Sequence, residues 1–319
     1  MQARDQKAMQ ALRAAQLYYQ QDRTMEAIAH ELRTSRSSVS RLLSYAREIG
    51  IVDIRVSSPL EHAGILAKRI HSRYGVSAHV VPMPGSVSET DRLDRVAMTG
   101  AHLLAQFMES NMVVGVAWGS TVSAVSRHLT RVPVHGTTFV QLNGAGNTLT
   151  TGVEYSSEIL VRFREAFDAK VQQFPVPAFF DDPRTRDAMW RERMTQRVLG
   201  LQSRMDIALF SVGSPAADVP SQVYVGGYLE DEDYRQLEDD GAIGDVATVF
   251  YRADGSWRDI ALNHRATGPS LDRLRRVPRR ICAVAGTHKL AALRGALAGE
   301  LVTDLVVDEL LASRLIEAP

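Results

Sequence analysis

From residue 77 onward the chain alternates short apolar runs with segments of helical periodicity, and this alternation limits the possible folds more than any other feature. The expected strands are "SAHVVP" (77–82), "MVVGVAW" (112–118), "TTFVQL" (137–142), "DIALFSV" (206–212), "RICAVAG" (280–286) and "LVTDLVVD" (301–308). The expected helices cover residues 90–109, 121–130, 154–167, 184–199, 286–298 and 308–316. Short apolar strands separated by helices are typical of a parallel sheet. We therefore expect a large, doubly wound α/β domain.

Several of these strands end in glycine and small polar residues. The stretches are "VAWGSTVSAV" (116–125), "QLNGAGNT" (141–148), "FSVGSP" (210–215) and "AVAGTHK" (283–289). In open α/β sheets, ligands bind beyond the carboxyl ends of the strands, and a helix N-terminus favours an anion such as phosphate. One glycine after a strand usually marks only a turn. Several strands of one sheet that end in this way predict a binding site for a small anionic molecule.

The usual signatures of nucleotide and metal sites are missing from the sequence. No stretch reads GxxxxGK[ST], and no GxGxxG is followed by an acid at the right distance. The nine histidines show no spacing typical of metal ligands. We therefore expect neither a cofactor nor a metal site.

The N-terminal residues follow a different pattern. Met25, Ile28, Ala29 and Leu32 form one apolar stripe on a short helix, and the same spacing restarts after Ser35. Ser35 is a good N-cap for the second helix. With the preceding amphipathic segment "AMQALRAAQLYYQQ", this predicts an all-α helix-turn-helix unit. "IVDIRVS" (51–57) alternates like a short strand, which is consistent with a winged variant.

The outward face of the second helix carries arginine and small hydroxyl residues. Such residues can bond phosphates, and arginine can also read guanine. Residues 1–58 hold nine Arg or Lys against six acids, although the whole chain is balanced at 37 of each. A solvated polar face is the alternative interpretation. The predicted DNA-binding residues are Ser35, Arg36, Ser37, Ser38, Ser40, Arg41 and Tyr45.

The stretch "SSPLEHAG" (57–64) interrupts both patterns, and we place the domain boundary there. The predicted domains are residues 1–58, a helix-turn-helix domain, and residues 59–319, an effector-binding and oligomerisation domain. No apolar run is long enough to span a membrane, and the first residues do not read as a secretory signal. With a single cysteine, Cys282, the composition predicts a soluble, cytoplasmic protein.

The residues resemble a known family over nearly the whole chain. "TMEAIAHELRTSRSSVSRLLSYAREIGIVDIRV" resembles the DNA-binding end of the SorC family of bacterial sugar-responsive transcription regulators. "GVAWGST", "VGSP", "GAIGD", "LNHRATGPSLDRLRRVP" and "VAGTHKLAALRGALAGELVTDLVVDE" resemble the effector domain of that family. The resemblance implies a fold similar to sugar-phosphate isomerases and coenzyme A transferases. One departure is Arg33, where such turns often carry glycine.

The resemblance also implies an effector site. Gly119, Ser120 and Thr121 would hold the phosphate, Asp245 would bond sugar hydroxyls, and Lys289 would lie near the ligand. A neighbouring loop with Asn143, Gly144 and Gly146 would line the pocket, and the glycine-ended stretches add Gly213. Lys289 is one of only four lysines among 37 basic residues, which suggests a need for a compact charge there. A surface position on the helix is the alternative for this lysine.

The sequence therefore favours a DNA-binding transcriptional regulator controlled by a phosphorylated sugar or sugar-alcohol, and not an enzyme. Its expected partners are double-stranded operator DNA, that effector, and further copies of the chain in a dimer or tetramer. The alternative is an enzyme like a sugar-phosphate isomerase with an N-terminal helical appendage, in which Asp245 and Lys289 would serve as base and electrostatic stabiliser.

Overall fold

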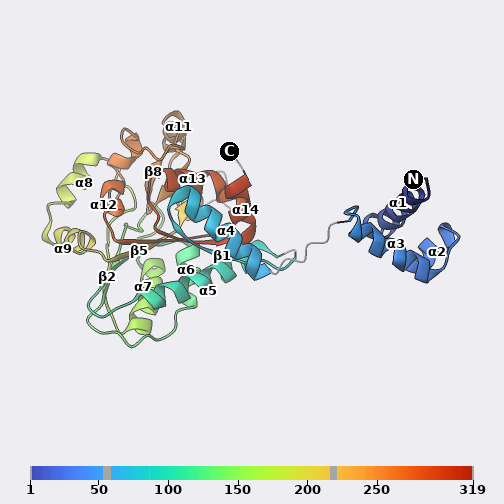
Figure 1. Cartoon of the computed structure of the whole chain (residues 1–319). Coiled ribbons are helices and arrows are strands. Elements are labelled where there is room, and N and C mark those ends of the chain that lie inside the picture. The colour runs from blue at the N-terminus through green and yellow to red at the C-terminus, as the bar shows by residue number, and fades with distance from the viewer. Residues whose placement is uncertain (1, 53–58, 86, 216–220, 318–319) are drawn as a thin grey trace. The chain divides into compact units, whose positions relative to one another are not determined.

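The computed structural model describes residues 2–52, 59–85, 87–215 and 221–317. The chain divides into two compact units, Met1–Ser58 and Pro59–Pro319. Figure 1 shows the small helical unit in blue and the large mixed unit in the remaining colours. Each unit has its own cluster of buried apolar side chains.

The small unit consists of helices packed around one core. Its elements are α1 (Gln2–Ala15), the π-helical turn η1 (Gln16–Gln20), α2 (Met25–Glu31) and α3 (Arg36–Glu48). Ser35 is the N-cap of α3, and its hydroxyl accepts from the Ser38 amide. Thr24 is the N-cap of α2, and its hydroxyl caps that helix in the same way. Val39, Leu43 and Ala46 of α3 are buried, as the apolar periodicity predicts.

A tight turn joins α2 to α3. Arg33 adopts a left-handed conformation with φ of 51°, and the Thr34 amide donates to the Ala29 carbonyl at 2.9 Å. A residue with a Cβ pays about 1–2 kcal/mol for this conformation, which explains why glycine suits such a position. Of the expected wing, Ile51 and Val52 form no strand. Residues 53–57 of the wing lie outside the described residues.

The large unit is built on a seven-stranded parallel sheet. Its order is β1-β10-β9-β5-β2-β3-β4, and every pairing within it is parallel. The strands are β1 (Ser77–Val81), β2 (Val113–Val116), β3 (Thr138–Gln141), β4 (Lys170–Gln172), β5 (Ile207–Phe210), β9 (Arg279–Val284) and β10 (Asp304–Asp308). All six strands expected from the apolar runs form, and β4 is an additional edge strand.

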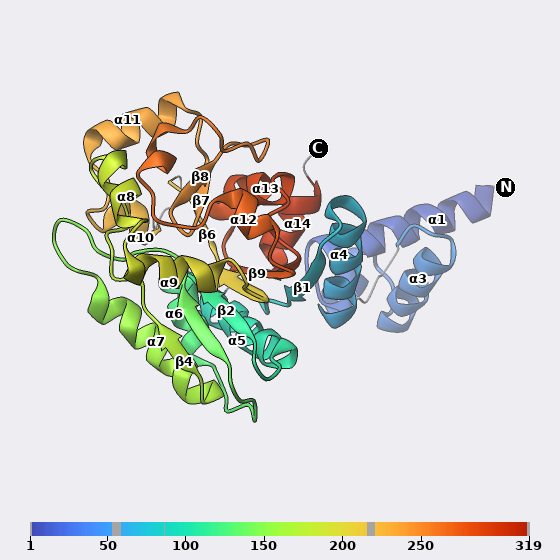
Figure 2. The ribbon, with the colours of Figure 1, turned by 90° about the vertical axis from the view of Figure 1, so that its left-hand side faces the viewer.

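Helices cover both faces of this sheet (Figures 1 and 2). One face carries α5 (Glu89–Phe107), α6 (Ser120–Arg127) and α7 (Val153–Phe167), which pack side by side. The other carries α4 (Pro59–Tyr74), α9 (Arg193–Gln202) and α14 (Glu309–Glu317). None of the helices described is long and apolar enough to cross a membrane.

The expected helix over residues 184–199 is two helices instead, α8 (Pro183–Met189) and α9. Trp190 ends α8, and its ring packs against Phe174 and Phe180, with centroids 5.7 Å and 6.2 Å away. Glu192 then takes an extended conformation as the N-cap of α9. A tertiary contact of Trp190 therefore accompanies the break, which the helical periodicity did not reveal.

A small antiparallel sheet stands beside the large one and was not expected. It contains β6 (Val212–Gly213), β7 (Gly244–Val246) and β8 (Val249–Tyr251), in that order. The same region contains α10 (Gln222–Val225), α11 (Asp231–Asp239), η2 (Ala261–His264) and α12 (Leu271–Arg275). After β9 come η3 (Thr287–Lys289) and α13 (Leu290–Ala298). Strands of two or three residues are too short to show periodicity, so the sequence gives no sign of them.

Candidate functional site

A pocket with a cavity volume of about 50 Å³ opens beyond the carboxyl ends of β2, β3 and β5. Chain segments far apart in the sequence meet around it. Of the predicted effector residues, the pocket is lined by Gly119, Ser120, Thr121, Asn143, Gly213, Asp245 and Lys289.

The N-terminus of α6 forms one wall of the pocket. Gly119 is its N-cap with φ of 137°, a conformation that favours glycine, and it has no side chain with which to cap the helix. Thr121 is buried, while Ser120 is exposed. The amides of this first turn and the two hydroxyls can therefore donate to an anion in the pocket.

Asp245 of β7 is the acid of the pocket and is almost fully buried, at 4% exposure. Its Oδ2 accepts from the Thr248 amide at 3.1 Å, while its Oδ1 has no hydrogen-bond partner. Burial raises the pKa of Asp245 to about 6, although the Thr248 amide, the nearby Tyr224 hydroxyl and the positive charge of Lys289 oppose the rise. The carboxyl is thus ionised at neutral pH, with one oxygen left to accept from a ligand hydroxyl.

Lys289 ends the short η3 turn and is buried, at 9% exposure. Its Nζ donates to the Val212 carbonyl at 3.0 Å. Burial lowers the pKa of Lys289, and its electrostatic interactions with Cys282 and Asp245 act in the opposite direction. Lys289 is therefore a pocket residue, and its interpretation as a surface residue is wrong.

Two further buried oxygens in the pocket lack partners. Asn143 is 1% exposed and its Oδ1 accepts no hydrogen bond; the Ser211 hydroxyl is likewise unpaired. An unsatisfied buried polar group costs about 1–3 kcal/mol, so such groups usually await a partner. Ser211 was missed from the sequence, although it lies in "FSVGSP", two residues before Gly213.

The four glycines of the predicted site have different roles. Gly213 pairs with Asp245 across the small sheet, and a Cβ at Gly213 would lie 1.8 Å from Asp245 Oδ1. Gly213 thus makes room for the carboxylate. Gly144 and Gly146 do not line this pocket. Gly144 is pressed against the backbone of Val176 and Pro177, where a Cβ would come within 2.2 Å of two carbonyl oxygens.

The polar groups of Gly144 and Gly146 already have protein partners. The Gly144 amide donates to Thr267 Oγ1, and its carbonyl accepts from Trp118 Nε1. Gly146 forms a bridge with Pro177 and faces a separate hollow. These two glycines let the loop pack closely against neighbouring backbone. In the sequence, a glycine needed for such packing looks the same as a glycine that lines a ligand site.

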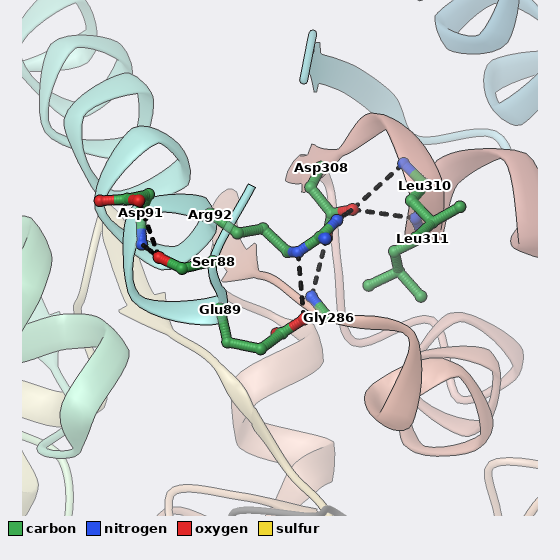
Figure 3. Close-up of polar contacts among 8 residues, drawn as sticks. All are labelled: Ser88, Glu89, Asp91, Arg92, Gly286, Asp308, Leu310 and Leu311. Atoms are coloured by element: carbon green, nitrogen blue, oxygen red, sulfur yellow. Dashed lines mark hydrogen bonds and ion pairs between the residues drawn. The ribbon is translucent and has the colours of Figure 1, made fainter. Parts of the chain in front are cut away.

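A second buried charged cluster holds the turn that carries Lys289 (Figure 3). Asp308, at the end of β10, is 0% exposed. Its Oδ2 accepts from the Gly286 amide at 2.8 Å, and its Oδ1 accepts from Arg92 at 3.0 Å and from the first amides of α14. Glu89 lies 3.3 Å from the Arg92 Nε. Asp308 therefore ties α5, α14 and the start of η3 together.

The predicted DNA-binding face lies on the small unit. Ser35, Arg36, Ser37, Ser40 and Arg41 are exposed, and Ser38 and Tyr45 are half-buried. Ser35 Oγ contacts the hydroxyls of Ser37 and Ser38, and Arg41 donates to Ser38 Oγ at 3.4 Å.

Neighbouring side chains already engage two residues of this face. Arg36 forms an exposed ion pair with Glu26 at 3.1 Å, and the Lys7 ammonium lies over the Tyr45 ring at 4.3 Å. Within the ranges that the structure describes, no group of three or more His, Cys, Asp or Glu side chains could hold a metal ion.

Comparison with known proteins identifies the family. The sugar-binding domain family matches residues 58–317. The chain belongs to this family. It is 33% identical to the deoxyribonucleoside regulator of Bacillus subtilis (strain 168), over 96% of each chain. These matches confirm the expected resemblance to the SorC-type regulators.

Solved structures show the same relationship. A domain of a "possible sugar-binding transcriptional regulator" from Arthrobacter aurescens TC1 is 53% identical, with a TM-score of 0.77, and covers 82% of this chain and 100% of its own. The full-length sorbitol operon regulator SorC from Klebsiella pneumoniae shares the fold, with a TM-score of 0.73 and 24% identity over 97% of this chain and 99% of its own. The relatives are transcriptional regulators, so the interpretation of the chain as a regulator and not an enzyme is confirmed.

Proposed function

We propose that the chain is a DNA-binding regulator whose pocket takes a phosphorylated sugar or sugar-alcohol. The observation that carries the proposal is an uncapped helix N-terminus facing unpaired acceptors across one pocket. The amides and hydroxyls at Gly119, Ser120 and Thr121 suit a phosphate. Asp245 Oδ1 and Asn143 Oδ1 suit the hydroxyl donors at the other end of a sugar.

Lys289 complements this arrangement with positive charge. Its ammonium lies inside the pocket wall, where a compact charge neutralises an anionic or polar ligand group without the planar geometry of arginine. Several ligand-facing groups of the protein are buried. On binding, the effector would therefore exchange its hydrogen bonds to water for hydrogen bonds to these fixed donors and acceptors. A ligand that lacked either the phosphate or the hydroxyls would leave buried groups unpaired.

The second half of the proposal concerns DNA. The α2–α3 pair forms a helix-turn-helix, and the exposed face of α3 meets the major groove, with Arg41 and the serines of its first two turns nearest the DNA. Arg36 would leave its ion pair with Glu26 and bind a DNA phosphate, because an exposed ion pair contributes only about 0–1 kcal/mol to stability. Effector and operator affinities would then be coupled reciprocally.

The experiment compares matched ligands. A thermal-shift screen of pentose and hexose phosphates, each beside its unphosphorylated parent, selects a ligand for calorimetric titration. We expect the phosphate ester to bind at least about 100-fold more tightly than its parent, or about 2.7 kcal/mol. Equal affinity for the two would remove the phosphate site from the proposal. Operator binding is then measured with and without the ligand, and an unchanged operator affinity would remove the coupling.

A further inference from the structure

A basic groove runs along the open edge of the large sheet. β4 is the last strand of the sheet, and Lys170, Val171 and Gln172 form the floor of the groove. Arg164 of α7, Arg197 of α9 and the nearby Arg204 add positive charge. No residue that lines the groove is Asp or Glu. The groove thus combines an edge strand of the sheet with four cations.

The cations of this groove are poorly paired within the chain. Arg164 reaches Glu165 only at 4.0 Å. Lys170, Arg197 and Arg204 form no ion pair with any carboxylate in the described parts of the chain. The groove therefore suits an anionic partner.

The complementary surface lies elsewhere on the same unit. Along and just before α11, the exposed acids are Glu230, Asp231, Glu232, Glu238 and Asp239, called here the acidic face. Arg235 is the only cation of α11. Among the described residues, no Lys or Arg forms an ion pair with an acid of the acidic face. The buried Asp233 of the same helix, in contrast, pairs with Arg265. Charge that the chain leaves unpaired in the groove is thus matched by charge of opposite sign on α11.

One copy cannot bring the two surfaces together. Figure 2 shows α11 at the top of the large unit and β4 near its lower end. Each surface also has an exposed apolar neighbour, Met194 on α9 and Tyr234 on α11. Met194 lies three residues before Arg197 and thus on the same side of the helix. Aromatic side chains, methionine and arginine are the residues enriched in protein interfaces.

We propose that the basic groove binds the acidic face of α11 from a second copy of this chain. A two-fold dimer could form the contact twice, because each copy has both surfaces. The proposal does not depend on the identity of the effector. It makes self-association sensitive to salt, because charges at an interface rim are screened by ions.

The test is a charge swap in the full-length chain, measured by sedimentation velocity. The groove variant Arg197→Glu/Arg204→Glu and the face variant Glu238→Lys/Asp239→Lys should each weaken self-association at least about 10-fold. A 1:1 mixture of the two variants should restore it, because each reversed surface then meets its complement. The control Arg69→Glu/Arg95→Glu alters exposed cations of α4 and α5 outside both surfaces and should associate as the wild type does.

Several results would overturn the proposal. They are a strictly monomeric wild type, variants that assemble like the wild type, or a mixture that associates no better than its components. A groove variant that assembles normally but binds DNA more weakly, with a shallower salt dependence, would assign the groove to nucleic acid. Melting curves show whether the variants fold. If a reversal does not fold, Arg197→Gln/Arg204→Gln and a salt titration of the wild type test the same contact, and an unchanged association constant in both would contradict it.

Discussion

Two of the buried carboxylates in the large unit, Asp308 and Asp245, differ in how fully they are satisfied. Asp308 accepts hydrogen bonds at both oxygens and pairs with Arg92. Asp245 has one oxygen occupied and one free, and it faces the pocket. The comparison teaches that burial alone does not identify a functional acid. The saturated carboxylate holds segments of the fold together, whereas the unsaturated one has capacity left for a ligand.

The largest expected effect comes from breaking the saturated cluster. Asp308→Ala leaves the buried Arg92 with only the exposed Glu89 as a partner and removes the acceptor of the Gly286 amide. We expect the free energy of unfolding to fall by about 3–5 kcal/mol, measured by urea denaturation. The control Asp272→Ala removes the partner of Arg258 from an exposed ion pair and should cost no more than about 1 kcal/mol. A loss below 1 kcal/mol for Asp308→Ala would contradict the comparison.

The pH dependence of stability should distinguish Asp245. Its pKa is about 6 in the folded chain against 3.8 for an ordinary aspartate, so the folded state binds the proton more tightly. Stability should therefore fall as the pH rises from about 4 to 7, by about 3 kcal/mol in total from this group. Asp245→Asn should remove that slope while weakening sugar binding. Unfolding curves at several pH values check this, and identical slopes in variant and wild type would be the contrary result.

Charge at the N-terminus of α6 should affect the ligand more than the fold. Thr121→Asp places a carboxylate beside the proposed phosphate, and like charges in contact cost several kcal/mol. We expect a phosphorylated effector to bind about 100-fold more weakly, while operator binding without effector is retained. Thr121→Val, of similar shape but uncharged, is the control and should lose far less affinity. Calorimetry that shows equal losses for the two variants would rule out charge as the cause.

The smallest effects are expected on the exposed face of α3, where no group is buried. Arg41→Ala should weaken operator binding by about 1–3 kcal/mol if the side chain reads a base. Arg36→Ala should cost less, because Arg36 must first leave Glu26. Fluorescence anisotropy with operator and scrambled DNA separates base from phosphate contacts, and Arg13→Ala on α1 is the control. A double variant at Arg36 and Arg41 with wild-type affinity would exclude α3 as the recognition helix.

The sequence by itself determined the elements whose stability depends on nearby residues. Six strands followed from apolar runs, and the cap of α3 followed from Ser35 preceding an apolar stripe. Both signals are local, because side-chain periodicity and a capping hydroxyl act within a few residues. The short strands of the small sheet left no such signal, since two or three residues show no period.

Only the tertiary structure decided which of these local features meet. Gly119 and Gly144 both follow strands, yet Gly119 opens a helix at the pocket while Gly144 is packed against the backbone of Val176 and Pro177. Likewise, Lys289 could have lain on the surface, and nothing near Asp245 in the sequence shows that one of its oxygens stays unpaired. Burial and hydrogen-bond satisfaction depend on residues that long-range strand pairing brings together, so no local pattern records them.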